Sequence, residues 1–176
     1  LTSGTRDTVT VDGGNANVGL IGQAAGADKY SVTIAKDKTL TATTMNTAGD
    51  ELTVNAANNF KLNSATATNV ELVVNIANTG TAAIAVDLVQ ATTQNAKTVN
   101  LSGNEVVLKD ATGLSLKGAV VNSTATKSTV EITGTAAAAT DLSKAQVSEV
   151  KLSGAGATTI TVNENSKLVL AKDQAS

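Results

Sequence analysis

The stretch Val99-Asn-Leu-Ser-Gly103 decides the predicted fold, because its pattern returns three more times in the second half of the chain and once near the start, at Val9-Thr-Val-Asp-Gly13. The further copies are Leu114-Ser-Leu-Lys-Gly118, Val130-Glu-Ile-Thr-Gly134 and Val150-Lys-Leu-Ser-Gly154. In each copy, two aliphatic residues two positions apart point to one side of an extended chain, and the glycine then turns the backbone. The copies follow one another at similar intervals, which is typical of a repeat architecture. Each copy is therefore predicted to be one short strand and one turn.

The composition predicts a thin core made of small side chains. The chain has 176 residues, of which 41% are hydrophobic but only 1% aromatic, so large rings contribute little to burial. It contains no proline, which suits strands that lie between two neighbours, although compositional drift in a Thr/Ala/Asn-rich chain is the alternative explanation. We expect one domain over residues 1–176. Because the chain begins with Leu1, we expect it to be a fragment of a longer surface protein.

The chain lacks residues on which several classes of function usually depend. The chain has no cysteine and no histidine, which removes thiol catalysis, thiolate metal sites and the commonest general base. The net charge is −2, with no basic stripe and no set of stacking aromatics, so nucleic acid is not an expected partner. No run of about 18 apolar residues exists, so no membrane span is expected.

Short alternating segments fill the rest of the chain, about 8 to 12 residues apart. Residues 55–59 and the other Asn/Gly/Asp clusters are predicted turns. Residues 136–150 could form a helix capped by Asp141, but the helical period is poor and an extended loop leading into a strand at Val150 is preferred. The predicted strands cover residues 9–11, 30–34, 39–43, 52–54, 60–62, 70–76, 83–89 and 160–162.

Two all-β folds fit such strands. An immunoglobulin-like sandwich would be expected to bring hairpin turns, a large core aromatic and usually some proline. A parallel β-solenoid (β-helix) predicts very short strands, small aliphatic ladders and corners of glycine and asparagine. We therefore predict an all-β parallel β-solenoid with roughly 17 to 22 residues per coil and about eight to ten coils.

The units at 99–103 and 141–154, followed by Ala157-Thr-Thr-Ile-Thr-Val162, resemble the Thr/Ala/Gly-rich repeats of bacterial surface-layer (S-layer) proteins. The likeness is to the type I-secreted Gram-negative kind, as in Caulobacter and Campylobacter, and to related large repeat adhesins, and it is clearest over residues 97–170. The resemblance implies a secreted β-solenoid segment that tiles on the cell surface, often ordered by calcium. Its implied partners are other copies of itself and flanking domains of the same chain, with cell-surface polysaccharide as a further candidate.

The segment 13–21 departs from the calcium signature of β-roll repeats. It keeps Gly13 and Gly14, but Ala16 replaces the third glycine and Val18 replaces the ligand aspartate. We therefore predict no cofactor and no metal site in residues 1–176, and leave calcium a role only in the full-length assembly.

Three classes of function follow. The first is a structural, self-associating segment of a surface layer or extracellular fibre. The second is an adhesin stalk or a module that binds ice, glycan or a host surface, since threonines at 8, 10, 39, 41, 43, 159 and 161 could form rows; threonine's preference for exposed strand positions is the simpler explanation. A further alternative beside these three classes is a variable outer domain of a flagellin or phage fibre, which shares the same composition.

The third class is an enzyme, because parallel β-helices host polysaccharide lyases and hydrolases. Paired carboxylates could cleave glycosides, but acids near strands are usually solvated surface charge, and the chain has one arginine, Arg6, and no aromatic sugar platform. We expect no enzyme and assign no catalytic residue. The candidate carboxylates are Asp50, Glu51, Asp87, Glu105, Asp110, Glu131 and Glu164.

Overall fold

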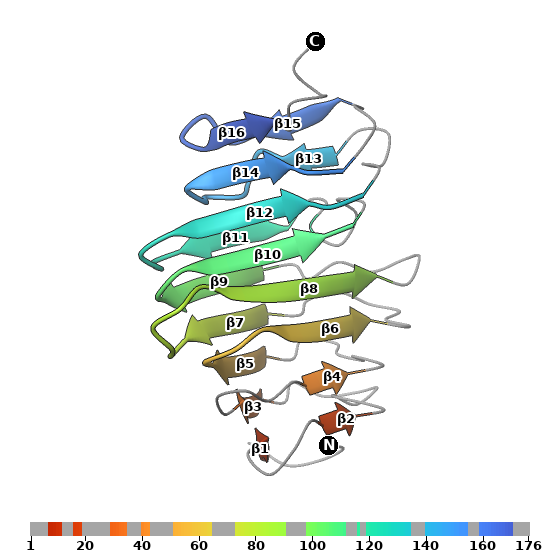
Figure 1. The fold of residues 1–176 in the computed structure, drawn as a ribbon, viewed down its shortest axis with the longest axis vertical. Helices are drawn as coiled ribbons and strands as arrows, with labels where there is room; N and C mark the ends of the chain where they lie inside the picture. The colour runs from red at the N-terminus through yellow and green to blue at the C-terminus, as the bar shows by residue number, and fades with distance from the viewer. Residues whose placement is uncertain are drawn as a thin grey trace.

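The structure is a computed structural model, and it confirms the all-β parallel β-solenoid. It describes residues 7–11, 16–18, 29–34, 40–42, 51–64, 73–90, 98–111, 116, 119–134, 140–154 and 159–170. In these residues every strand pairing is parallel, and the strands rise in sequence order from the N-terminal to the C-terminal end of a stack (Figure 1).

Most odd-numbered and all even-numbered strands form two separate walls of the solenoid, so a coil gives one strand to each wall. A six-stranded sheet runs in the order β1 (Asp7–Val11), β3 (Lys29–Ile34), β5 (Glu51–Ala56), β7 (Val73–Asn78), β9 (Thr98–Gly103) and β11 (Val120–Ser123). An eight-stranded sheet runs from β2 (Ala16–Val18) through β4 (Leu40–Ala42), β6 (Phe60–Ser64), β8 (Ile84–Gln90), β10 (Val106–Asp110), β12 (Ser128–Ile132) and β14 (Glu149–Leu152) to β16 (Lys167–Leu170). β13 (Thr140–Leu142) and β15 (Ile160–Val162) form a two-stranded sheet.

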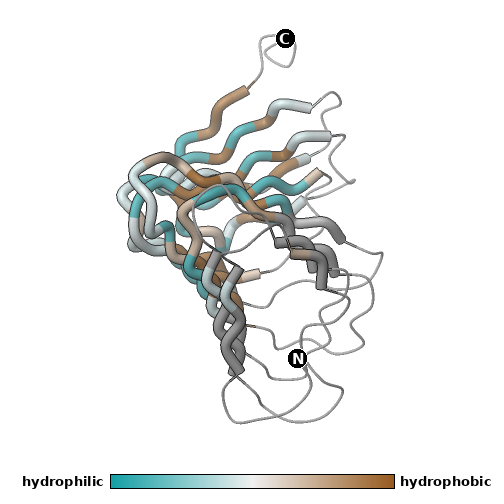
Figure 2. The backbone as a smooth tube through the Cα atoms, turned by 60° about the horizontal axis from the view of Figure 1, so that its bottom comes forward, coloured by the Kyte–Doolittle hydropathy of each residue, from teal (hydrophilic) through white to brown (hydrophobic). Residues whose placement is uncertain are grey.

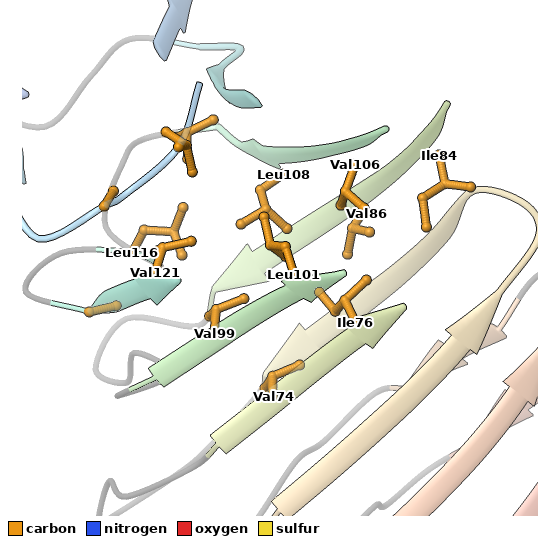
Figure 3. Packing of buried hydrophobic residues seen from close by; sticks show 14 of the residues in the cluster. Val74, Ile76, Ile84, Val86, Val99, Leu101, Val106, Leu108, Leu116 and Val121 are labelled. Carbon is orange, nitrogen blue, oxygen red and sulfur yellow. The ribbon is translucent and has the colours of Figure 1, made fainter. Parts of the chain in front are cut away.

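Alternation along the strands places the core between the two long sheets. In β7, burial alternates residue by residue, with Val74 and Ile76 inside and Asn75 on the outer face. The inner side chains of β7 and β9 point toward those of β8 and β10 (Figure 3). The same alternation of apolar and polar residues follows the tube along each wall (Figure 2). The buried side chains are mainly Val, Leu, Ile and Ala, as the composition predicted.

The recurring five-residue units do not occupy equivalent places in the coil. Val130 and Val150 are register partners in the eight-stranded sheet, so the interval between these two units is a true coil repeat. Val99 instead lies in the six-stranded sheet, where its partner one coil on is Val121. Leu116, the described residue of the 114–118 unit, is buried in a turn rather than in a strand, and its backbone N–H donates to Asp110. The two shorter intervals between units therefore measure steps between different parts of the coil.

The coils are less regular than predicted. The step from Leu152 to its register partner Leu170 lies within the predicted coil length, whereas the step from Phe60 to its partner Val86 exceeds it. Both walls have aliphatic residues spaced by two, so the sequence pattern cannot tell one wall from the other. Because the longer coils use more residues each, the number of coils is lower than the upper end of the predicted eight to ten.

One local prediction changes in detail, and another holds. Strand β5 continues through Asn55 and Ala56, where the sequence predicts a turn, because Ala56 is fully buried in line with Val54. No helix forms among residues 140–150; an extended path containing β13 leads into β14, as expected. Asp141 begins a tight turn instead of a helix, since its carboxylate accepts the Ser143 N–H at 2.9 Å.

Gly103 turns the backbone as predicted, and it also meets the coil below. Its φ is +80°, a conformation that glycine adopts at little cost. A Cβ built at Gly103 would overlap the carbonyl oxygen of Asn78, its register partner in β7. Asn78 is itself a buried corner: its amide donates to the carbonyl oxygens of Ala82 (2.8 Å) and Glu105 (2.7 Å). Glycine is thus required by the stacking of coils as well as by the turn.

Gly103→Ala is expected to lower the free energy of unfolding by about 2 kcal/mol or more, through the positive φ and the overlap with Asn78. Urea denaturation of both proteins measures the loss. Ser102→Ala, on the outer face of the same strand, is the matched control and should change stability by about 0.5 kcal/mol or less. Equal stability of Gly103→Ala and the wild type would contradict the required glycine.

Candidate functional site

The carboxylates considered for catalysis that the structure describes lie at different positions of the coil. Asp50 lies outside the described residues, and Glu51 is placed only by its position at the start of β5. Asp110 is buried at 1% exposure at the end of β10, where its Oδ2 accepts the Leu116 N–H at 3.2 Å and so holds a corner of the coil. Glu164 is exposed in the turn between β15 and β16.

The remaining three carboxylates lie on outer positions of the coil. Glu105 forms an ion pair with Lys127 one coil away, at 2.9 Å. The hydrogen bond and the negative charge of Glu105 raise the pKa of Lys127 above its ordinary value. Asp87 and Glu131 belong to one row on the outer face of the eight-stranded sheet, which becomes visible only once the register is known.

This row, which we call the charge row, alternates in sign from coil to coil. Each member is the register partner of the next, on strands β6 to β14 (Figure 1). Opposite charges on directly paired residues stabilise adjacent strands, whereas like charges there would repel. The row therefore favours one stacking order of the coils. Its members are Lys61, Asp87, Lys109, Glu131 and Lys151.

Glu131 has an enclosed side chain within the charge row. Its Oε1 accepts from Lys151 Nζ at 2.9 Å and from Ser153 Oγ at 2.6 Å, and its side chain is 12% exposed. Burial raises the pKa of the Glu131 carboxyl, but these hydrogen bonds and the positive charges of Lys151 and Lys109 together lower it below its ordinary value. The ionised carboxylate is thus favoured in the folded protein.

A second outer row, on the six-stranded sheet, is neutral. We call it the amide row: Asn75, Asn100 and Asn122 are consecutive register partners. Asn100 Nδ2 donates to Asn75 Oδ1 at 2.8 Å, and Asn122 Nδ2 donates to Asn100 Oδ1 at 2.9 Å. Asn75 Nδ2 in turn donates to Thr53 Oγ1 at 3.3 Å. An amide is both donor and acceptor, so identical side chains satisfy one another along the axis.

Threonine does not form the long rows that a threonine-based binding face would need in the described part of the chain. Thr10 and Thr33 are exposed register partners, but the same row continues through Asn55 and Ala77. Thr41 is followed in its row by Lys61, and Thr161 pairs with Asp141. Thr39, Thr43 and the side chain of Thr8 lie outside the described part. The described threonines fit the simpler explanation, a preference for exposed strand positions.

A shallow hollow of about 400 Å³ lies near the C-terminal end of the stack. Gln146, Val147, Asn163 and Asn165 line it, and Asn163 already donates to the carbonyl oxygen of Ser143 at 2.8 Å. The lining offers amides but no charged or nucleophilic group. Hydrogen bonding to a polar ligand is the chemistry that these residues support.

Metal ligands do not gather in the described part of the chain, where no group of three or more Asp, Glu, His or Cys side chains could hold an ion. Residues 13–15 and 19–21 of the segment 13–21 lie outside it, while Ala16 to Val18 form β2. The absence of a metal site in this segment stays a prediction. Among the described residues, no helix is long and apolar enough to cross a membrane.

Comparison with known proteins found no matching family model, curated protein or solved structure.

Glu131→Gln is expected to lower the free energy of unfolding at pH 7 by about 1 kcal/mol, because it removes the charge that Lys151 and Ser153 stabilise. Since the folded pKa of Glu131 lies below its unfolded value, this contribution is complete above the unfolded pKa and is lost as pH falls through the folded one. The difference between variant and wild type should therefore shrink below about pH 4. Urea denaturation across pH measures it.

Asp87→Asn is the control, because it removes an exposed charge from the same row. It should change stability by about 0.5 kcal/mol or less. A pH-independent cost of Glu131→Gln would show that the charge itself does not matter.

Asn100→Asp is expected to destabilise the fold by about 1 to 3 kcal/mol, because a carboxylate would face the Asn75 Oδ1 acceptor with no donor to offer it. Thermal unfolding at neutral pH measures the loss. Asn165→Asp, on an exposed residue outside the amide row, provides the comparison. Similar melting temperatures for the two variants would show that the amide row contributes little.

Proposed function

We propose that this chain is a structural segment of a secreted bacterial surface-layer or extracellular fibre protein, and that it acts by self-association rather than by catalysis. The observation that carries the proposal is the repetition of outer side chains from coil to coil. A surface with an axial repeat offers equivalent contacts at many positions, which suits packing against copies of itself.

The chemistry of the two outer rows supports this proposal. In the amide row, donors and acceptors are largely satisfied within the row, and in the charge row opposite signs alternate. Neither row presents the block of like charge that keeps copies apart. The resemblance of the 141–154 unit to surface-layer repeats points to the same class of function.

The positions of the carboxylates also favour a structural role. Glu131 and Glu105 are each held by a lysine one coil away, and Asp110 holds a corner inside the solenoid. Each of these acids has a structural partner that accounts for its place. Other copies of the chain are the partners we propose, at the cell surface.

Assembly is the first property to test, by negative-stain electron microscopy of the purified chain in millimolar calcium and in EDTA. We expect sheets or regular fibres in both conditions, because Glu105 and Glu131 are neutralised by lysines of the same chain.

Dispersed single rods in both conditions would contradict self-association and favour an adhesin or other binding module. Fibres or sheets that form only with calcium would support the structural role but contradict the prediction that this segment needs no metal.

A further inference from the structure

The two ends of the eight-stranded sheet present open strand edges. β16 pairs with β14 and β2 pairs with β4, so each has a second edge with which no other described strand pairs. Because the described strands are parallel, the outer edge of β16 and the outer edge of β2 have complementary patterns of N–H and C=O groups. A parallel strand that continues the sheet beyond β16 therefore needs an edge of the kind that β2 presents.

The β16 edge also exposes residues that belong to interior positions. Leu168 and Leu170 are 44% and 42% exposed, and they are the large hydrophobic residues exposed in the described part of the chain. Leu168 is the register partner of Val150, which is fully buried. Leu170 follows Leu152 and Ile132 in the next row, and Ile132 is 1% exposed. The last described coil thus repeats the core pattern without a described coil above it.

The described part of the chain has a matching strand at the opposite end of the eight-stranded sheet. Following the register partners through the sheet, Val18 in β2 falls in the row of Leu170, and Asn17 falls in the row of Val169. Ala16, one residue earlier, takes the position of Leu168 and packs against the core.

We propose that β16 of one copy pairs in parallel with β2 of a second copy, so that the solenoids stack end to end into a fibre. Ala16 and Val18 would then lie in register with Leu168 and Leu170, so that the inner rows of one copy continue into the next. The outer row would continue from Val169 to Asn17, which brings no like charges together. This proposal rests on the self-association proposed above and names its contact. Since the two surfaces differ, the contact does not close and extends into a fibre.

The first test changes each end separately. Leu168→Lys combined with Leu170→Lys should convert fibres to monomers in sedimentation velocity and electron microscopy. Val169→Lys is the matched control, because it adds a lysine to the same strand on the outer row, and it should keep the fibres. The double variant should keep its far-UV circular dichroism, since both leucines are already exposed.

Mixing identifies the partner surface. Ala16→Lys combined with Val18→Lys should also give monomers, and an equal mixture of the two double variants should give dimers, because one intact end of each kind remains. A second readout uses the absence of cysteine in the chain. In-register parallel neighbours lie about 4.8 Å apart, within the Cα separation of about 4.4 to 6.8 Å that disulfides require. Asn17→Cys with Val169→Cys in one chain should therefore yield a ladder of covalent oligomers on oxidation.

Three results would overturn the end-to-end contact. Fibres that persist in the Leu168→Lys, Leu170→Lys variant would place the contact elsewhere while leaving self-association intact. Covalent dimers from Val169→Cys alone, without longer oligomers from the paired variant, would show two C-terminal ends meeting each other. A wild-type chain that stays monomeric at all concentrations would refute both this contact and the proposed function.

Discussion

The structure depends on one constraint: the backbone N–H and C=O groups of each coil form their hydrogen bonds with the coils on either side. Parallel strands cannot be joined by a tight hairpin, and in the described part of the chain each ladder joins residues that are a whole coil apart. The coils must therefore keep register over the whole stack. Gly103, which lets its backbone approach Asn78, and the buried amide of Asn78, which spans two coils, both serve this requirement.

The outer rows secure the same register by different chemistry. In the amide row, each asparagine side chain donates a hydrogen bond to one neighbouring coil and accepts one from the other. The same pair of bonds can therefore form at every coil of the row, whatever its place in the stack. In the charge row, the sign of the side chain alternates from coil to coil. A coil stacked one place out of order would therefore put a charged residue beside a residue of the same sign, which would repel it. The first row allows the stack to extend, and the second restricts how it is ordered.

The fold class followed from the sequence, but the rows did not. Alternating aliphatic residues, corner asparagines and the lack of large rings were enough to predict a parallel solenoid with a thin core. The charge row could not be predicted because its members lie far apart in the sequence and at uneven intervals. Without the register, Asp87 and Glu131 are indistinguishable from unrelated surface acids. The mistaken equivalence of Val99 and Val130 has the same origin, since both walls carry the same local pattern.

Alternation of sign along the axis also governs what the solenoid presents to its surroundings at a distance. With about 4.8 Å per coil, the charge row repeats every two coils, or about 10 Å, which is close to the screening length of about 0.1 M salt. The fields of neighbouring lysines and acids cancel within that range, so the charge row produces little electrostatic potential at larger distances. Two solenoids can lie side by side along it without long-range repulsion and without a preferred axial offset imposed from afar. The relative orientation of two solenoids along this row is then set by short-range contacts and by the shape of the touching surfaces.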